Sequence, residues 1–415
     1  MARRRVAITG LGLVSPLGDE PQQFFARLLR GESGIGLLSS DDDRGVISRP
    51  ASQCLNFNPE AVLGKALAHT MDRFSQLGAA AAFSAWQDAG FKLDNNAERV
   101  DFGVAWGTGV GGVLTYEQGY RNLYKNNQRM VSPLSVVLGM NNAAASHIAI
   151  KLGLGGPNMT YSVACASSTI AIGEAFHQVR DGKASLMLVG GSEAPLAFGV
   201  VRAWEALRVL SSGNAENAAS ACRPFNKDRS GLVLGEGSGA LVIEDWEHAA
   251  ARGARIYAEL VGYGTSCDHS HLVRPSGAGE IRAMQNALDD GRLDIDQIDY
   301  VNAHGTATQE GDPTEISSLK TIFGHRAPSL PVSATKSMHG HMLGATGAIE
   351  AIITVLAINK NAIPPTANLN EIDPSCIGVN HVRGAALTGV RLRAALSNSF
   401  AFGGANAVLA FRATP

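Results

Sequence analysis

Cys165 lies at a point in the sequence where a thiol could act as a nucleophile. Residues 158–163 alternate in polarity and predict a strand, while residues 166–179 carry apolar side chains at helical spacing. The cysteine is therefore expected at the start of a helix, where unpaired backbone N–H groups and the macrodipole favour an anion. Such a setting can lower the pKa of a free thiol from about 8.5 toward neutrality. The alternative is a small cysteine packed among alanines, since free cysteine is among the most buried residue types.

Two histidines in the second half of the chain lie at the ends of predicted elements. His304 ends an apolar strand in a glycine turn, and His341 precedes an apolar helix over residues 348–358. A lone histidine is more often a core or surface residue, but these two lie in loops rich in glycine and small residues. A neutral imidazole can donate to a developing oxyanion and can move protons near pH 7. We predict that both are catalytic and that His339 points elsewhere.

Lys336 and the glycine-rich residues 400–406 are the candidates for supporting roles. The lysine could act directly as a cation, or it could pair with Glu315 or Glu350 and hold the site together; we favour the pairing role. Consecutive glycines let the backbone approach another group closely, so residues 400–406 could aim an N–H at a reacting carbonyl oxygen. A plain turn at a sheet edge would explain these glycines equally well.

A weak internal repeat organises the elements that carry these residues. Residues 258–266 resemble the N-terminal strand and loop, and residues 299–307 match residues 101–109 at Asp, Ala, Gly and Thr. The helix after His341 corresponds to the helix after Cys165. A repeat of this length predicts an α/β protein of two similar halves related by a pseudo-twofold axis, with mostly parallel buried sheets between helical layers.

The boundary between the halves is expected near residue 250. Residues 1–250 would carry the nucleophile, and residues 251–415 would carry the catalytic histidines. Cys165 and His341 would then occupy equivalent helix starts and face one another across the joint between the halves.

Two further segments carry local expectations. Residues 10–18 follow a short apolar strand and predict a glycine-punctuated loop, but the spacing does not match a dinucleotide-binding GxGxxG motif. Residues 116–133 are polar and predict an irregular segment.

Composition excludes several classes of protein. The chain has 415 residues, of which 45% are hydrophobic and 17% charged, and its net charge of −2 provides no basic field for nucleic acid or an anionic membrane. No apolar run reaches the roughly 18–20 residues that span a bilayer, and the basic N-terminus lacks the apolar region of a signal peptide. The five cysteines are scattered without a CxxC motif. This pattern argues against disulfides and zinc, although a cysteine and two histidines could in principle bind that metal, and it predicts a cytoplasmic protein.

Four segments together resemble the active-site signature of the β-ketoacyl-[acyl-carrier-protein] synthases. These are residues 162–168, 302–308, 336–347 and 398–406. The resemblance is greatest to the long-chain, second type of bacterial fatty acid synthesis, and it covers nearly the whole chain. Residues 107–112 and 224–237 also match. Four motifs in the family's order and spacing are far more specific than any one of them.

The resemblance implies the thiolase fold, a duplicated five-layer α/β/α/β/α architecture, and a homodimer. It places the family's nucleophile on Cys165, its catalytic histidines on His304 and His341, its lysine on Lys336, and its oxyanion-binding N–H groups on Cys165 and Phe402. Phe402 also matches the family's gating phenylalanine, and Phe400 belongs to the same loop.

The implied reaction is a decarboxylative Claisen condensation. Malonyl-carrier protein would condense with an acyl chain held on Cys165, lengthening a fatty acid by two carbons without any metal or organic cofactor. Acyl carrier proteins, the implied partners, are acidic, so a local basic patch is expected. Its members by position are Lys65, Arg129, Arg202 and Arg208, each of which could equally be a solvated surface residue.

Departures from the family's pattern leave the pathway open. Val110, Trp204 and Leu232 differ from the usual residues of the acyl pocket and gate, and Ala401 and Ala405 replace a glycine and a threonine in the gating loop. The alternatives are a ketosynthase of a secondary pathway, making a polyketide or a polyene, and the partner subunit of a ketosynthase heterodimer. A degradative thiolase is disfavoured, because that class needs a second catalytic cysteine near the C-terminus.

Overall fold

The two halves of the chain repeat one strand order. The structure, a computed structural model, describes residues 3–39, 49–94 and 99–414. In the first half the strands are β1 (Val6–Val14), β4 (Phe102–Gly107), β5 (Asn158–Tyr161), β6 (Leu186–Glu193) and β7 (Gly237–Asp245). In the second half they are β8 (Ala258–Cys267), β9 (Ile298–Asn302), β10 (Pro331–Ser333), β14 (Ala394–Phe400) and β15 (Ala405–Arg412). They lie side by side as β5-β4-β6-β7-β1 and as β10-β9-β14-β15-β8, so the predicted duplication is confirmed.

The two sets of strands join through their first members. β1 and β8 pair antiparallel over three residues, Val6 to Ile8 against Leu260 to Ala258. Within each set, the β4–β6 and β9–β14 pairs are parallel, as in α/β units. The β6–β7, β1–β7, β14–β15 and β8–β15 pairs are antiparallel, so the sheets are mixed and the expectation of mostly parallel sheets is wrong. A short strand, β12 (Asn380–His381), extends the second set beyond β10. The remaining strands form two small pairs, β2 (Gly36–Leu37) with β3 (Pro50–Ala51) and β11 (Ala362–Ile363) with β13 (Leu387–Thr388).

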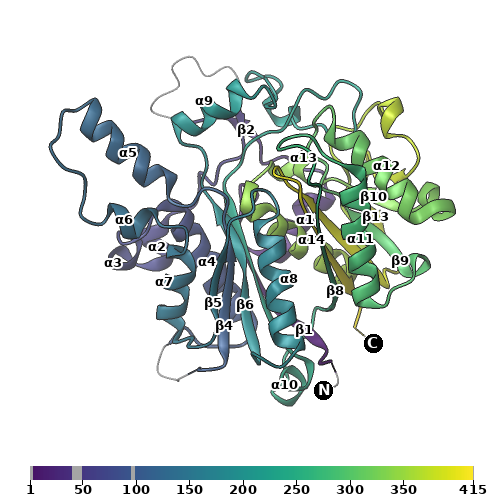
Figure 1. Cartoon of the computed structure of the whole chain (residues 1–415), viewed down its shortest axis with the longest axis horizontal. Coiled ribbons are helices and arrows are strands. Elements are labelled where there is room, and N and C mark those ends of the chain that lie inside the picture. Colours follow the sequence, from purple (N-terminus) through teal and green to yellow (C-terminus); the bar gives the residue numbers. More distant parts are fainter. Residues whose placement is uncertain (1–2, 40–48, 95–98, 415) are drawn as a thin grey trace.

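Helices cover both sheets and fill the space between them, which gives five layers (Figure 1). The outer layers contain α4 (Arg73–Asp88) and α7 (Ala143–Leu152) on the first half, and α11 (Gly277–Gly291) and α12 (Gly311–Phe323) on the second. The central layer contains α8 (Ser167–Arg180) and α14 (Thr346–Lys360). The other helices lie around these layers: α1 (Pro21–Leu29), α2 (Pro59–Leu63), α3 (Lys65–Ala68), α5 (Val113–Tyr124), α6 (Ser135–Gly139), α9 (Phe198–Ala206), α10 (Trp246–Ala251) and α13 (Lys336–His339).

The two central helices are the ones predicted after the candidate nucleophile and after His341. They approach closely at Gly347, where an added Cβ would lie 1.9 Å from Thr169 Oγ1. α14 is buried on every side from Thr346 to Ile358, as its all-round apolar sequence requires. The expectation that no apolar run is long enough to span a bilayer is wrong for Leu343–Lys360, the one described stretch that is apolar and long enough. However, 89% of it is buried inside the molecule, as in a core helix.

The prediction of a loop over residues 10–18 is wrong for most of these residues, because β1 continues to Val14. Gly10 and Gly12 lie in the strand and face α4. A Cβ on Gly10 would lie 2.2 Å from the carbonyl oxygen of Ala85, and one on Gly12 would lie 2.2 Å from that of Ala81. These glycines therefore admit a helix backbone against the strand instead of making a turn.

The prediction of an irregular segment over residues 116–133 is also wrong in its first part, because the helix α5 extends to Tyr124. Tyr116, Tyr120 and Tyr124 recur at helical spacing, a signal that the prediction of an irregular segment overlooked, although no residue of α5 is buried. Figure 1 shows α5 and the chain leading to α6 extending away from the layers.

Candidate active site

Cys165 lies in a tight turn between β5 and α8, two residues before the helix begins. The preceding Ala164 has a φ of +46°, a conformation that few residues other than glycine adopt. Ser167 holds this turn: its hydroxyl accepts a hydrogen bond from the Val163 N–H at 2.8 Å and donates to the Ala164 carbonyl at 2.7 Å. The cysteine is thus at a helix start, as predicted, and it is 6% exposed.

His341 contacts the sulfur directly, with Nε2 3.1 Å from Cys165 Sγ. Its other nitrogen, Nδ1, accepts a hydrogen bond from the backbone N–H of Leu343 at 3.2 Å and lies 3.0 Å from the Thr346 hydroxyl. Because a neutral imidazole carries one proton, the proton is on Nε2. His341 therefore presents an N–H, not a lone pair, toward the sulfur.

His304 lies across from His341, with ring centroids 5.6 Å apart and planes at 85°. The Lys336 ammonium lies 3.4 Å from His304 Nδ1. Since a lysine ammonium can only donate, Nδ1 accepts and the proton of this imidazole is also on Nε2. Burial lowers the pKa of both histidines well below the ordinary value, and the charge of Lys336 lowers it further. Both rings are therefore neutral N–H donors near pH 7.

One ligand atom each from Cys165, His304 and His341 lies within 4.8 Å of the other two, close enough to hold a metal ion. A metal would need the lone pairs of the ring nitrogens. The hydrogen bonds to both Nδ1 atoms instead place N–H groups at the Nε2 atoms. The arrangement favours hydrogen-bond donation over metal ligation.

Lys336 pairs with Glu350, one of its two expected partners. Its ammonium lies 2.7 Å from Glu350 Oε1, both side chains are fully buried, and it also donates to the backbone carbonyl of His304. Burial raises the pKa of Glu350 to about 7, while the lysine opposes that rise. The other expected partner, Glu315, accepts the backbone N–H groups of His304 and Gly305, each at 2.8 Å. Both carboxylates thus hold the His304 turn, one through Lys336 and one directly.

Burial shifts the pKa of the Cys165 thiol upward, whereas its place at a helix start was expected to lower it. It raises the pKa of Cys165 to about 11, while the charge of Lys336 and the backbone N–H groups of Phe402 and of the cysteine itself act to lower it. The prediction of a pKa near neutrality is wrong for this enclosed site, because removing a thiolate from water costs more than the local positive charges return.

The glycine-rich segment is both the turn between β14 and β15 and a wall of the site. Gly403 and Gly404 have φ values of +86° and +75°, which favour glycine. The Gly403 N–H donates to the Leu272 carbonyl at 2.7 Å, which ties this turn to the chain after β8. Phe400, Ala401 and Phe402 line the cavity that contains Cys165.

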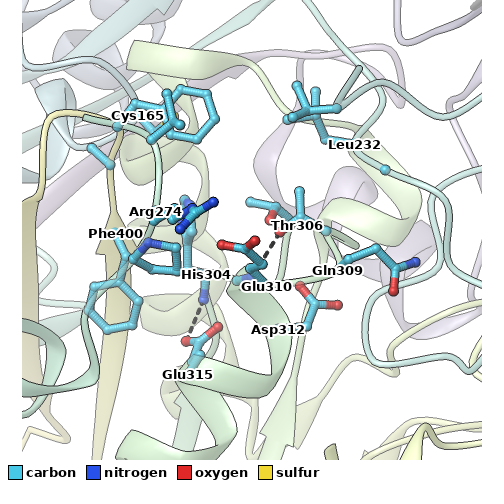
Figure 2. A pocket seen from close by; sticks show the side chains of 18 of the residues that line it. Cys165, Leu232, Arg274, His304, Thr306, Gln309, Glu310, Asp312, Glu315 and Phe400 are labelled. Carbon is cyan, nitrogen blue, oxygen red and sulfur yellow. Dashed lines mark hydrogen bonds between the residues drawn. The ribbon is translucent and has the colours of Figure 1, made fainter. Parts of the chain in front are cut away.

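This cavity has a volume of about 300 Å³ and is lined by the cysteine and both histidines. Figure 2 shows Cys165 and His304 among its lining residues. Trp204 and Leu232 line it, and the Trp204 ring stacks on Phe402 with centroids 5.8 Å apart. Val110, the third residue expected in the acyl pocket, is not among the described residues that line it. The Val110 N–H instead donates to Glu193 at 3.0 Å.

Glu193 is a site residue that the sequence analysis missed. It is fully buried at the end of β6 and accepts N–H groups from Gly109 at 2.5 Å and from Gly344 at 2.9 Å. It therefore links the loop after β4 to the loop after His341. The sequence held one signal, a carboxylate two residues after the predicted apolar strand of residues 184–191.

The four basic residues expected to bind a carrier protein are exposed but lie on separate elements. Lys65 begins α3, Arg129 lies between α5 and α6, and Arg202 is in α9, where it pairs with Glu205 at 2.5 Å. Arg208 follows α9 and is the one of the four that lines the cavity.

The fold has two layers of sheet with a central pair of helices between them. A cysteine faces two histidines near the start of those helices. Together these features define a condensing enzyme of the thiolase fold. The chain belongs to the β-ketoacyl synthase family: residues 3–249 match the family's N-terminal domain, and residues 257–370 match its C-terminal domain. It is an acyltransferase that forms carbon–carbon bonds.

Three relatives illustrate the range of the family. The chain is 42% identical over 415 residues to 3-oxoacyl-[acyl-carrier-protein] synthase 2 of Staphylococcus aureus (strain N315), covering 99% of this chain and 98% of that one. It is 43% identical over 413 residues to Nodulation protein E of Rhizobium sp. (strain N33), covering 99% of each. A solved type II PKS acyl-carrier protein in complex with its ketosynthase bound to the hexaketide is 31% identical, with a TM-score of 0.91 over all of both chains.

Proposed function

We propose that this β-ketoacyl synthase elongates acyl chains of fatty acid synthesis, taking both of its substrates from an acyl carrier protein. The observation that carries the proposal is the 3.1 Å contact between Cys165 Sγ and His341 Nε2 in a cavity that His304 also lines. A nucleophile beside two neutral N–H donors suits a reaction that first captures an acyl group and then develops an enolate oxygen.

In the first half-reaction, Cys165 Sγ attacks the thioester carbonyl of the acyl-carrier protein. The acyl–sulfur bond to the carrier breaks, the acyl group bonds to Cys165, and the carrier thiol leaves with the proton that Cys165 gave up. The backbone N–H groups of Cys165 and Phe402 lower the thiol pKa. In this mechanism they donate to the oxyanion of the tetrahedral intermediate. One such donor is typically worth about 10²–10³ in rate.

In the second half-reaction, malonyl-carrier protein loses its carboxylate as CO₂, and the electron pair forms an enolate. The Nε2–H groups of His304 and His341 donate to the enolate oxygen. The enolate carbon attacks the acyl carbonyl on Cys165, the carbon–sulfur bond breaks, and the thiolate regains a proton. Lys336, Glu350 and Glu315 hold the His304 turn, and neither step requires a metal or an organic cofactor.

The enzyme works as a homodimer in the cytoplasm, with structural halves over residues 1–250 and 251–415. β5 supports the dimer, because it is the last strand of the sheet and leaves one edge unpaired within the described chain. Large apolar side chains are exposed on the neighbouring elements, among them Ile150 on α7 and Val136 on α6, which are 72% and 70% exposed. Exposed apolar surface of this extent beside an open edge suits a second copy of the chain.

A ketosynthase of a secondary pathway is the second candidate. Trp204 and Leu232 at the cavity, and Ala401 in its gating loop, differ from the usual residues of the fatty acid enzymes. The similarity to Nodulation protein E and to a polyketide ketosynthase also favours it. Such an enzyme would catalyse the same condensation but on an acyl chain different from those of fatty acid synthesis. A heterodimer partner without catalytic activity is disfavoured by Cys165.

Acyl transfer from carrier proteins loaded with saturated C2 to C16 chains tests the proposal. Intact-mass measurement should show one acyl adduct, located at Cys165 and absent from Cys165→Ala but present in the matched variant Cys267→Ala, which removes an exposed cysteine. Fastest transfer with C12–C14 chains supports fatty acid elongation, while uniformly poor transfer of saturated chains supports the secondary pathway. An adduct elsewhere would contradict the assignment of the nucleophile.

A further inference from the structure

Thr346, the first residue of α14, contacts one of the two catalytic rings from behind. Its side chain is buried, and its hydroxyl lies 3.0 Å from His341 Nδ1, the nitrogen that faces away from Cys165. Among the described residues, this nitrogen is the only hydrogen-bond partner of the hydroxyl. Thr346 is not among the described residues that line the cavity. Its hydroxyl can therefore act on the reaction only through His341.

The direction of this hydrogen bond follows from the neighbouring backbone. The Leu343 N–H donates to the same nitrogen at 3.2 Å, and a proton on Nδ1 would point at that N–H. Nδ1 of His341 therefore carries a lone pair, and the Thr346 O–H donates to it. Which imidazole nitrogen keeps the proton is set by the hydrogen bonds of the other one, so both donors keep the proton on Nε2.

The two donors belong to different parts of the fold. Leu343 lies in the short turn after His341 and has a φ of +42°, whereas Thr346 begins a helix that is buried on every side. The main chain of His341 is held separately, because its N–H donates to the Val233 carbonyl at 2.7 Å. The hydroxyl of Thr346 is thus the group that ties the ring itself to the central layer of helices.

We propose that Thr346 is a positioning residue for the condensation, whose hydroxyl holds the His341 ring so that Nε2–H points at Cys165 Sγ and then at the enolate oxygen. The proposal rests on the role given above to His341. Two donors at Nδ1 also polarise the ring and make Nε2–H a stronger donor, because linked hydrogen bonds strengthen one another. Orientation matters here, since a displacement of about 1 Å in a reacting group can cost about 10²-fold in rate.

Thr346→Val tests the proposal, because it removes the hydroxyl and keeps the branched shape of the side chain. The kcat for CO₂ release from malonyl-carrier protein should fall about tenfold, a typical size for loss of the outer hydrogen-bond partner of a metal-binding histidine. The KM for malonyl-carrier protein should stay unchanged. Single-turnover acyl transfer to Cys165, followed by intact mass, should fall less, because backbone N–H groups serve the oxyanion of that step. If Thr346→Val does not fold, Thr346→Ala removes the same hydroxyl.

Thr346→Ser separates hydrogen bonding from structural support. It keeps the hydroxyl but loses a buried methyl group, so it should keep most of the decarboxylation rate while unfolding at a lower temperature than Thr346→Val. A merely structural role predicts the reverse, namely activity that follows thermal stability. Thr354→Val is the matched control, since Thr354 is buried in the same helix but donates to the Glu350 carbonyl at 2.7 Å. It should leave the decarboxylation rate unchanged.

Equal decarboxylation rates in the wild type and in the folded Thr346→Val protein would overturn the proposal. So would a Thr346→Ser protein as slow as Thr346→Val, an equal fall in both half-reactions, or a loss that appears only as a higher KM. Failure of the role given to His341 has a different signature, because His341→Ala would then decarboxylate malonyl-carrier protein at the wild-type rate.

Discussion

At the scale of single residues, burial has opposite consequences for the two kinds of catalytic group. It raises the thiol pKa of Cys165 and so reduces the thiolate available for attack. It also keeps His304 and His341 neutral, which is the state in which each presents one N–H to an enolate oxygen. The site therefore favours the second half-reaction at some cost to the first.

The pH dependence of thiol alkylation checks this balance. Because burial raises the pKa of Cys165 to about 11, the thiolate fraction should grow with pH across the whole range from 7 to near 11. The rate of modification of Cys165 by iodoacetamide should then rise about tenfold per pH unit, whereas an ordinary thiol levels off above about 8.5. Peptide mass spectrometry of brief reactions measures the rate, with the exposed Cys267 as an internal control. A plateau near pH 8 would contradict the expectation.

Removing one member of the Lys336–Glu350 pair should lower the free energy of unfolding more than removing both members. Lys336→Met leaves a buried carboxylate without its partner and should lower the free energy of unfolding by about 3–5 kcal/mol. The double variant with Glu350→Met should recover most of that loss but not the condensation rate, because the His304 turn still lacks its lysine. Denaturant titration measures the stability.

Lys227→Met is the matched control for this pair, since Lys227 pairs with Glu371 at the same 2.7 Å but in solvent. It should leave stability almost unchanged. Equal losses in the buried and exposed variants would show that burial does not set the strength of the Lys336–Glu350 pair.

At the scale of elements, the site depends on how closely helices approach strands. α4 lies against β1 at Gly10 and Gly12, and α8 lies against β8 where a Cβ on Gly173 would fall 2.2 Å from the ring of Tyr263. No side chain separates helix from strand at Gly10 and Gly12, whereas at Gly173 the Tyr263 ring fills the space, and close contacts of both kinds set the separation of the layers. The position of Cys165 at the start of α8 follows from that separation.

Gly12→Ala should therefore destabilise the protein, since its Cβ would fall 2.2 Å from the Ala81 carbonyl oxygen. Overpacking of this sort typically costs about 1–3 kcal/mol. Gly36→Ala is the control, because nothing lies within 4 Å of the added Cβ and the residue is exposed. Thermal unfolding of both variants is the measurement, and a Gly12→Ala protein as stable as Gly36→Ala would refute the close approach.

At the scale of the whole molecule, the sheet ends on β5 at one side and on β12 at the other, and the apolar surface beside these two ends differs. β5 ends the sheet beside α5, α6 and α7, which carry exposed Tyr120, Tyr124, Val136 and Ile150. The opposite end is β12, near which Ile377 is exposed at 58%. A dimer through the β5 end would cover the larger of these apolar surfaces.

Light scattering should accordingly give a mass twice the 43.4 kDa of one chain. Ile150→Arg places a charge in the proposed interface and should shift the population toward monomer. Ile377→Arg makes the same change at the other end of the sheet and should leave the dimer intact. A monomeric wild-type protein, or equal effects of the two substitutions, would contradict the proposed surface.

Local patterns in the sequence determined a large part of this protein. Helical spacing placed α8 after Cys165 and α14 after His341, and the internal repeat implied two halves with the same order of strands. The motifs around Lys336 and residues 398–406 marked further site residues. The helices follow from periodicities of a few residues, which a sequence displays directly. The two halves follow from a repeat as long as half the chain, and the motifs were recognised by their resemblance to those of the β-ketoacyl synthases.

Only the tertiary structure decided which groups meet and in what protonation state. Cys165 and His341 are 176 residues apart in sequence. The choice of Glu350 over Glu315 for Lys336 and the linking role of Glu193 are both contacts of this long-range kind. The raised pKa of the thiol follows from burial by both halves at once. Desolvation and hydrogen bonding depend on everything packed around a group, so the residues near it in sequence do not determine them.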